Sequence, residues 1–478
     1  MLSFLLNDRE VQLETVGPAD TLLDHLRINE GLTGTKEGCA EGDCGACTVL
    51  IGRPAATGMA YLPANACIRL MPSLAGCHVV TVEHLAQGGA LHPVQEAMVA
   101  SHGSQCGFCT PGIVMALAAL RLSDDAPDRA TAEEALQGNL CRCTGYAPIL
   151  EAAMAPADGA CAVRDGADAA ARRLGDLPPA PERLESPAGR VYLPRDLQGL
   201  SRALVEAPEA TLVAGATDIG VWTAKAFRDI APAIFLGGIA DLARIEPVPG
   251  GLRIGAAVSY ADLLPHIDAR HPHLSAYWRR IGGPQIRGAG TIGGNLATAS
   301  PIGDTPPPFM ALDARLILRS AVGTREIALD AFFTGYRQTA LAPGEIIEAV
   351  LLPDPDPAAF HGAWKISKRR DEDISSLSAA FSLWIEDGRV RKARIAFGGM
   401  AATPARAQAL ESWLTGRAWT LETALAAAAP LAEDFSPISD MRASASYRGL
   451  VARNLVVRAW RASTGADDEP LEASHAAG

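Results

Sequence analysis

The hydrophobic pattern of the chain changes near residue 92. Before that point apolar residues occur in short runs, and the runs at 2–6 and 10–16 are separated by Asn7 and Asp8, which predicts a β-hairpin. A short helix is expected to start at Asp20 or Thr21 and to end near Gly31. Two further strands are expected at 48–51 and 79–82. The first part of the chain is therefore expected to form a small mixed sheet with one helix.

From residue 92 the apolar positions follow a helical period. Helices are expected over 93–101, over 112–122 opened by Thr110 as N-cap and Pro111, and over 148–154. Another helix is expected to start at Thr131, because Thr131 and Glu134 have the spacing of a capping box. This stretch therefore predicts a small helical bundle.

The rest of the chain mixes both patterns. Residues 155–190 are rich in Ala, Pro, Gly, Asp and Arg without an apolar period, which predicts a linker. Strand-like residues run into a small-residue turn at 211–218, and a second glycine-rich turn covers 288–295. Strands and helices are then expected at 379–385, 390–397, 405–414, 421–431 and 445–461. The acidic, small-residue tail 463–478 is expected to be disordered.

Length and charge limit the classes of function. A chain of 478 residues is too long for one hydrophobic core, so several domains are expected. The net charge of −12 argues against a nucleic-acid partner, because phosphate binding needs a clustered basic face. No run of eighteen or more apolar residues predicts a membrane span, and the N-terminal residues lack the features of a secretory signal. We therefore expect a cytoplasmic protein without a membrane partner.

Eight of the ten cysteines have metal-ligand spacing. Cys39, Cys44 and Cys47 form C-x4-C-x2-C with Cys67 further on, which is the plant-type pattern for a [2Fe-2S] cluster. Two short turns supply a second set of four sulfurs, which are those of Cys106, Cys109, Cys141 and Cys143. Two one-electron centres in one chain suggest an electron relay.

The alternative for these cysteines is structural zinc, which also takes C-x2-C pairs in fours. The C-x4-C-x2-C spacing favours iron-sulfur clusters, and so does the single residue between Cys141 and Cys143, which is closer than the ligand spacing of a zinc ribbon. Of the two cysteines left over, Cys77 is expected to be a small buried hydrophobic residue, and Cys161 in the linker has no predicted role.

Glycine-rich turns are the second candidate for chemistry. Gly288, Gly290 and Gly293 satisfy G-x-G-x-x-G, but we expect neither the preceding strand nor the following helix that a nicotinamide-binding Rossmann motif needs. Successive N–H groups in such turns can still bind a pyrophosphate. Two glycine turns beside an electron relay therefore favour a flavin. The charged run 365–374 is expected to be a solvated loop.

The sequence resembles the molybdenum hydroxylase (xanthine oxidase) family, and within it the smaller, iron-sulfur and FAD subunit of bacterial xanthine dehydrogenases. The stretches that carry the resemblance cover most of the chain outside the linker and the tail. They are 33–47, 103–112, 138–146, 289–295 with 300–304, 367–369 and 396–400.

The resemblance implies an α+β multidomain fold. The expected parts are a plant-ferredoxin-like β-grasp [2Fe-2S] domain (1–86), a four-helix [2Fe-2S] domain (87–158), the linker (159–190), an FAD domain of the vanillyl-alcohol-oxidase type (191–354), a C-terminal α+β domain (355–462) and the tail (463–478).

The resemblance also implies the site residues. Flavin contacts are expected from Leu212, Val213, Ala214, Gly215, Ala216, Thr217, Asp218, Ile219, Ile281, Thr291, Asn295, Asp304, Ile347 and Lys365. Candidate contacts to the nicotinamide, or in the loop that controls access to the flavin, are Asp218, Lys368, Arg369 and Asp371.

The implied reaction is electron transfer. A molybdopterin-containing partner subunit would oxidise hypoxanthine or xanthine, and electrons would pass through two [2Fe-2S] clusters to FAD and then to NAD. The chain is expected to lack the molybdopterin region and to assemble with the large subunit as an (αβ)2 heterotetramer. The alternatives are the same subunit of a hydroxylase for aldehydes or other N-heterocycles, a free-standing iron-sulfur flavoprotein carrier, and a zinc-built scaffold.

Overall fold

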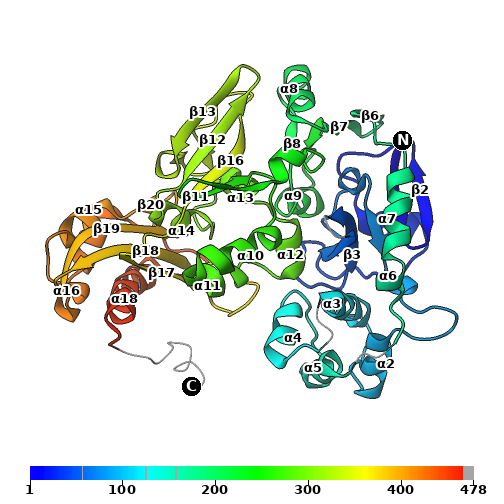
Figure 1. Ribbon diagram of the computed structural model, residues 1–478, viewed down its shortest axis with the longest axis horizontal. Coiled ribbons are helices and arrows are strands. Elements are labelled where there is room, and N and C mark those ends of the chain that lie inside the picture. Colours follow the sequence, from blue (N-terminus) through cyan, green and yellow to red (C-terminus); the bar gives the residue numbers. More distant parts are fainter. Residues whose placement is uncertain (56–57, 124–125, 157–158, 467–478) are drawn as a thin grey trace. The chain divides into compact units, whose positions relative to one another are not determined.

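The computed structural model describes residues 1–55, 58–123, 126–156 and 159–466, which Figure 1 shows coloured along the sequence. The chain divides into two compact units. The first unit comprises residues 1–243, 257–262 and 282–294, and the second comprises 244–256, 263–281 and 295–478. Within the described ranges, no helix is both long and apolar enough to cross a membrane.

The first unit begins with a mixed five-stranded sheet of order β2-β1-β5-β3-β4. Its strands are β1 (Leu2–Leu6), β2 (Arg9–Leu13), β3 (Thr48–Ala55), β4 (Gly58–Asn65) and β5 (His78–Val80). β1 pairs antiparallel with β2 and parallel with β5, which confirms the hairpin and the mixed sheet. The short helix α1 (Leu22–Asp24) starts at the N-cap Thr21 and continues as a π-helical turn, His25–Asn29. Strand β4, rich in Gly, Ala and Pro, was not predicted.

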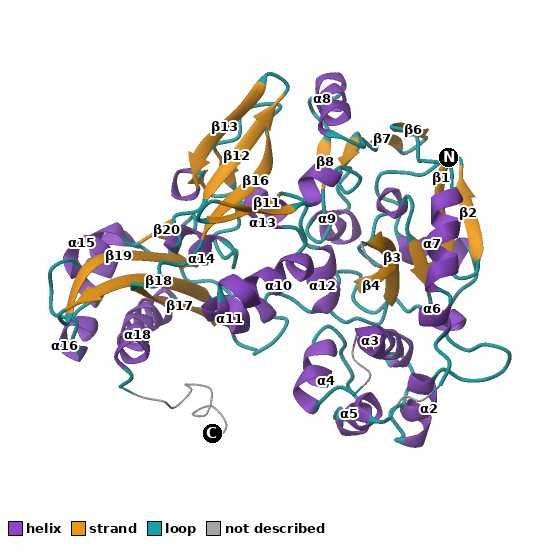
Figure 2. Cartoon of the chain, viewed as in Figure 1, coloured by secondary structure: helices purple, strands orange, loops and turns teal. Residues whose placement is uncertain are grey.

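Four helices follow, and Figure 2 shows them grouped without an intervening strand. They are α2 (Pro93–Ala100), α3 (Thr110–Ser123), α4 (Arg129–Ala135) and α5 (Ala147–Met154), which confirms the bundle. The predicted capping box is wrong. Helix α4 starts two residues before Thr131, because the Asp128 carboxylate accepts the Thr131 N–H at 2.8 Å and caps the helix.

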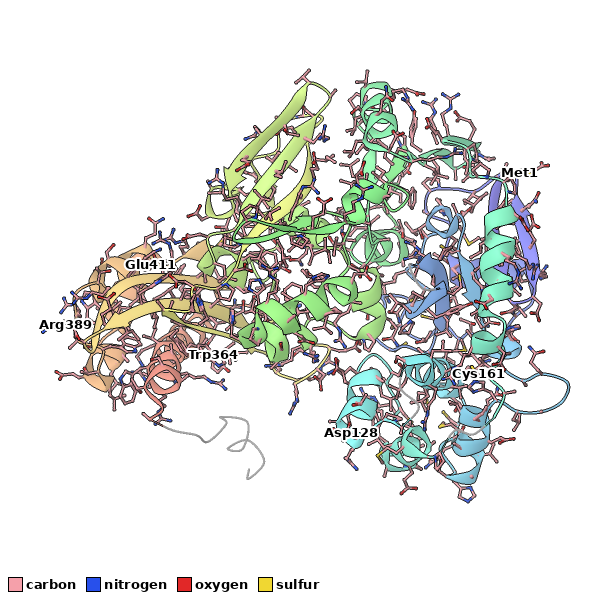
Figure 3. All side chains as sticks on the ribbon, in the orientation of Figure 1. Met1, Asp128, Cys161, Trp364, Arg389 and Glu411 are labelled. Carbon is pink, nitrogen blue, oxygen red and sulfur yellow. The ribbon has the colours of Figure 1, made fainter. Side chains whose placement is uncertain are left out.

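The predicted linker is partly structured. It contains α6 (Ala162–Asp165), α7 (Ala167–Asp176), β6 (Arg183–Ser186) and the start of β7 (Gly189–Tyr192). Helix α7 places Ala170 and Leu174, four residues apart, against Leu5 of β1. This apolar pair was too short a pattern to predict a helix, yet it covers one face of the first sheet. Cys161, labelled in Figure 3, is buried before α6, and Cys77 is buried as predicted.

The remainder of the first unit is built on a four-stranded sheet of order β6-β7-β9-β8. Its other elements are β8 (Thr211–Val213), β9 (Ala233–Phe235), α8 (Leu197–Glu206), α9 (Ile219–Ala226) and α12 (Pro284–Ala289). β7 and β8 both pair parallel with β9, so the chain crosses over between them through helix α8.

The second unit contains two further large sheets. The antiparallel sheet β10-β11-β16-β12-β13 consists of Ile245–Val248, Gly251–Gly255, Ile346–Pro353, Arg315–Ser320 and Gly323–Ala328 in that order. The sheet β17-β18-β19-β20 consists of Ala359–Ile366, Leu377–Glu386, Arg389–Gly398 and Ala405–Arg406. Short helices of this unit are α11 (Ser275–Arg279) and α14 (Pro306–Ala311). Helix α10 (Tyr260–Arg270) starts in the first unit and continues into the second.

Helices cover the C-terminal sheet. They are α15 (Gln408–Leu414), α16 (Leu421–Leu425), α17 (Ala428–Asp434) and α18 (Ala445–Thr464). Glu411 on α15, labelled in Figure 3, accepts the Ile395 N–H of β19 at 2.7 Å and so ties the helix to the sheet.

Three predictions for this region need correction. Residues 405–406 form a strand instead of the start of a helix. The helix expected at 421–431 is two helices, and the break places Pro430 in the first turn of α17, where proline is tolerated. Helix α18 extends two residues into the predicted tail, and residues 467–478 lie outside the described residues.

Three histidines meet beside the C-terminal sheet. His271 is fully buried and neither ring nitrogen has a hydrogen-bond partner, and the rings of His273 and His361 have centroids 5.1 Å apart. Burial lowers the pKa of His271 to about 4 and that of His273 to about 3. These imidazoles are therefore neutral in the folded protein at pH values where the unfolded chain, with an ordinary His pKa of 6.5, already binds protons.

The second unit is therefore expected to lose stability as the pH falls from 6.5 towards 4. The variant His273→Gln should reduce that loss by about 1.4 kcal/mol per pH unit, because one fewer proton is taken up on unfolding. Hydrogen exchange of the β17 amides at pH 5.5 and 4.5 measures the slope. Identical slopes for the variant and the parent would contradict this expectation.

Candidate cofactor sites

The first predicted cluster site lies on the loop before β3 and just after β4. The Cys39 thiol is within hydrogen-bonding reach of Cys44 and Cys67, and Cys67 is also within reach of Cys47. The structure therefore brings together all four sulfurs that the spacing predicted.

Hydrogen bonds within this group favour the thiolate form of Cys39 and Cys47, whereas the pKa values of their thiol partners Cys44 and Cys67 are raised. Hydrogen bonds from the Cys44 and Cys67 thiols hold the pKa of Cys39 far below its usual range, and a bond from Cys67 lowers the pKa of Cys47. The Asp43 and Cys44 amides also donate to the Cys39 sulfur at 3.3 and 3.4 Å. Because a metal binds the thiolate form, these donors fit a cluster ligand set.

The glycines of this loop serve two purposes. Gly45 has a φ of +67°, and a side chain there would also meet the Gly138 carbonyl oxygen at 2.0 Å. Gly38 has no positive φ, but a Cβ atom would lie 2.8 Å from the Cys44 sulfur. Gly45 thus permits a backbone conformation with positive φ, whereas Gly38 leaves space beside a sulfur.

The second predicted site consists of two sulfur pairs in the helical bundle. Cys109 is paired with Cys141, and Cys106 is paired with Cys143. Burial and the Cys141 thiol raise the pKa of Cys109 to about 12. Burial would also raise the pKa of Cys141, but hydrogen bonds led by that of the Thr144 hydroxyl, 3.3 Å away, outweigh it and lower that pKa.

Paired sulfurs match a binuclear cluster better than a single ion. A zinc site needs its ligands around one centre, whereas each iron of a [2Fe-2S] cluster takes two thiolates of its own. The arrangement therefore fits the cluster better than the zinc alternative.

The two cysteine groups adjoin each other within the first unit. The Leu140 N–H, next to Cys141, donates to the Cys44 carbonyl oxygen at 3.0 Å. The Asn139 side chain, which is buried, donates to the Gly45 carbonyl oxygen at 3.0 Å. One main-chain hydrogen bond thus joins a residue of the first group to the segment that carries the second.

The predicted flavin loop, Leu212–Ile219, runs from the end of β8 to the start of α9. Its backbone approaches α12 so closely that a Cβ atom on Gly215 would lie 1.9 Å from the Ala289 carbonyl oxygen. Ala216 has a φ of +60°, and the Asp218 Oδ2 atom is buried without a hydrogen-bond partner. A tight turn with a spare buried acceptor fits a polar ligand such as a nucleotide.

The second glycine turn lies between helices. Helix α12 precedes it and α13 (Ile292–Thr298) follows it, so the expectation that no helix follows is wrong. The Rossmann assignment still fails, because a helix stands where that motif requires a strand. The Thr291 hydroxyl accepts the Gly294 N–H at 3.1 Å at the start of α13.

The other predicted flavin contacts belong to the second unit. Ile281 and Ile347 are buried there. The Asn295 Oδ1 atom is buried without a hydrogen-bond partner, which is costly unless a ligand supplies a donor. Such an orphaned acceptor fits a flavin contact.

Asp304 and Lys365 are also in the second unit, and they pair with each other. The Lys365 ammonium lies 2.6 Å from Asp304 Oδ2, and the Ser375 hydroxyl donates to Asp304 Oδ1 at 2.5 Å. Both charged side chains are buried, so the prediction that Lys365 starts a solvated loop is wrong. Ser375 was not predicted, although it directly follows the charged run 365–374.

The predicted access loop begins after β17. Lys368 and Arg369 are exposed, and the Lys368 ammonium donates to the Met441 carbonyl oxygen at 2.9 Å. The Arg369 N–H donates to Asp373 Oδ2 at 2.9 Å. Asp371 is half-buried in the same loop, whereas the other nicotinamide candidate, Asp218, belongs to the first unit.

Four protein-family models match consecutive parts of the chain. They describe a 2Fe-2S iron-sulfur cluster binding domain (4–68), a [2Fe-2S] binding domain (81–154), an FAD binding domain in molybdopterin dehydrogenase (186–355) and a CO dehydrogenase flavoprotein C-terminal domain (362–463). With the two cysteine groups, these matches define an iron-sulfur flavoprotein with two [2Fe-2S] domains and an FAD-binding domain.

Known relatives narrow the class further. The chain is 34% identical to xanthine dehydrogenase of Emericella nidulans over 88% of its length, and 33% identical to xanthine dehydrogenase/oxidase of Rattus norvegicus over 92%. It spans only 35% and 37% of those two proteins. The similarity therefore extends over most of this chain but over only about a third of each relative.

Solved structures match part of the chain. A carbon monoxide dehydrogenase chain from Hydrogenophaga pseudoflava matches with a TM-score of 0.54 and 28% identity, over 56% of this chain and 94% of its own. A chain of quinoline 2-oxidoreductase from Pseudomonas putida matches with a TM-score of 0.53 and 27% identity, over 58% and 97%. The fold prediction, α+β with separate cluster and FAD domains, is thus confirmed.

Proposed function

We propose that this chain is the electron-transfer subunit of a cytoplasmic xanthine dehydrogenase. In this proposal a large partner subunit holds the molybdopterin cofactor and hydroxylates hypoxanthine or xanthine, and the two subunits form an (αβ)2 heterotetramer. When bound, the [2Fe-2S] clusters carry single electrons and the FAD converts them to the hydride that NAD accepts.

The arrangement of the two cysteine groups carries this proposal. Each group gathers four sulfurs, and one hydrogen bond, from the Leu140 N–H to the Cys44 carbonyl oxygen, joins the segments that hold them. A structural metal would need no such junction, whereas a relay needs two redox centres close together. The proposed cluster ligands are Cys39, Cys44, Cys47 and Cys67 for one cluster, and Cys106, Cys109, Cys141 and Cys143 for the other.

The proposed flavin residues supply complementary groups. The proposed polar contacts to the flavin are the backbone of the 212–219 turn, the Thr291 hydroxyl, Asn295, Asp304 and Lys365. Ile281 and Ile347 would contact the apolar part of the flavin ring. Asp218 and the 368–371 loop are proposed to contact NAD or to control its access.

A variant of Asn295 tests the flavin assignment. Asn295→Leu removes the orphaned Oδ1 acceptor, so it should not destabilise the protein without flavin but should weaken FAD binding by about tenfold, equivalent to about 1.4 kcal/mol. Flavin absorbance after dialysis and thermal unfolding report the two effects. Asn454→Leu, the same substitution on the exposed face of α18, is the control. Unchanged FAD occupancy in Asn295→Leu would count against the assignment.

The comparisons support two candidate classes of substrate. Two relatives that share 34% and 33% identity with the chain are named as xanthine dehydrogenases, which favours a purine. The matched structures are named for carbon monoxide and quinoline instead, so the same subunit in a hydroxylase for another N-heterocycle is the second candidate.

Purification of the protein from its native source separates these possibilities. A co-purifying molybdenum protein and xanthine-dependent reduction of NAD would support the proposal. Hydroxylation of quinoline or an aldehyde, but not of xanthine, would support the second candidate instead. A protein with iron and flavin but no molybdenum partner would instead be a free-standing electron carrier.

A further inference from the structure

Gln285 on helix α12 contacts both segments that carry the cysteine groups, although it belongs to neither segment. Its side chain is 1% exposed, and its Nε2 atom donates to the Asn139 Oδ1 atom at 2.8 Å and to the Thr48 hydroxyl at 3.2 Å. Thr48 directly follows Cys47, and Asn139 lies two residues before Cys141. Gln285 therefore binds one residue from each cysteine-bearing segment with a single amide group.

The direction of these hydrogen bonds is set by their neighbours. The Thr48 hydroxyl donates its only proton to the Gly45 carbonyl oxygen at 2.6 Å, so it can only accept from Gln285. Asn139 uses its NH2 group on the same carbonyl oxygen at 3.0 Å, so its Oδ1 atom is the acceptor for Gln285. The site therefore requires a donor at position 285, whereas the buried Gln285 Oε1 atom has no hydrogen-bond partner.

The space around this side chain is equally restricted. A Cβ atom on Gly138 would lie 1.8 Å from the Gln285 Oε1 atom, so only glycine at 138 leaves room for the side chain. The same helix is held against the bundle by Arg287, whose guanidinium donates to Gln137 Oε1 at 3.0 Å and lies 3.3 Å from a Glu134 oxygen. Helix α12 thus holds Gln285 in place.

We propose that Gln285 is a positioning residue for electron transfer between the two [2Fe-2S] clusters. By donating to both Thr48 and Asn139, it fixes the separation of the Cys44–Cys47 loop from the segment before Cys141. This inference rests on the proposed function, because it requires that both cysteine groups hold clusters.

The test uses the full-length protein with its cofactors and compares two kinds of variant. Gln285→Glu keeps the size but replaces the donor with an acceptor, and Gln285→Met removes hydrogen bonding without adding charge. Gln137→Glu is the matched control, because the same chemical change there keeps the acceptor that Arg287 needs. Low-temperature electron paramagnetic resonance of the dithionite-reduced protein measures the magnetic interaction between the clusters, and rapid-freeze experiments measure electron transfer between them.

The expected result is that both Gln285 variants retain two cluster signals but show a weakened magnetic interaction and several-fold slower electron transfer between clusters, while Gln137→Glu matches the parent. Unchanged interaction and rate in both Gln285 variants would overturn the proposal. So would loss of a cluster in both variants, because Gln285 would then hold a domain together instead of setting a distance. Absence of two cluster signals from the parent protein would contradict the proposed function itself.

Discussion

Replacement of Lys365 with methionine is expected to destabilise the second unit by about 3–5 kcal/mol, because it leaves the buried Asp304 carboxylate without its counter-ion. The side chains of Lys365 and Asp304 are only 3% and 10% exposed, so water cannot replace the lost ammonium. The Ser375 hydroxyl would remain as a donor to Asp304 Oδ1, but it carries no charge.

Urea unfolding followed by hydrogen exchange of the β17 and β18 amides measures this loss. Lys392→Met is the control, because Lys392 is exposed and lies over the face of the Trp384 ring, so its loss should cost only about 0.5–1 kcal/mol. Adding Asp304→Asn to Lys365→Met removes the unpaired charge and should restore much of the stability. Equal stabilities of Lys365→Met and Lys392→Met would show that the pair is not buried in solution.

Cys141→Ser is expected to eliminate one [2Fe-2S] signal completely. Serine removes the thiolate of a sulfur that is paired with Cys109 and held by the Thr144 hydroxyl, and an alcohol is a poor substitute for a cluster thiolate. The other cluster and the FAD should remain, because their proposed ligands lie in other sequence segments.

Iron content and electron paramagnetic resonance of the reduced variant measure this effect. Cys161→Ser is the matched control, since Cys161 is also buried but belongs to neither cysteine group. It should retain both signals. If Cys141→Ser also kept both signals, its sulfur would not be a cluster ligand and the assignment of the second group would fail.

Features set by neighbouring residues could be predicted from the sequence. The hairpin of β1 and β2 and the helices α2, α3 and α5 follow from turn residues, apolar periods and prolines at helix starts. The helix start at Asp128 was missed because two candidate caps lie three residues apart, and the side chain of the first one reaches the free N–H groups. Helix α7 was missed because its buried face is a single Ala170 and Leu174 pair.

Features that depend on distant residues could not be predicted in this way. Cysteine spacing predicted which sulfurs gather, because Cys106 and Cys109 share one short turn and Cys141 and Cys143 share another. The contact between Asp304 and Lys365 joins positions 61 residues apart, and that between Asn139 and Gln285 joins positions 146 apart. Neither the charged run at 365–374 nor the sequence around Gln285 indicates such a partner. The resemblance named Asp304 and Lys365 as flavin contacts, but their mutual pairing required the structure.

The central claim is that this chain holds two [2Fe-2S] clusters and one FAD for electron transfer. Metal analysis, flavin determination and low-temperature electron paramagnetic resonance of the purified, dithionite-reduced protein test it most directly. The account predicts two distinct [2Fe-2S] signals and one FAD per chain. A colourless protein with stoichiometric zinc, or a protein with only one cluster signal, would contradict it.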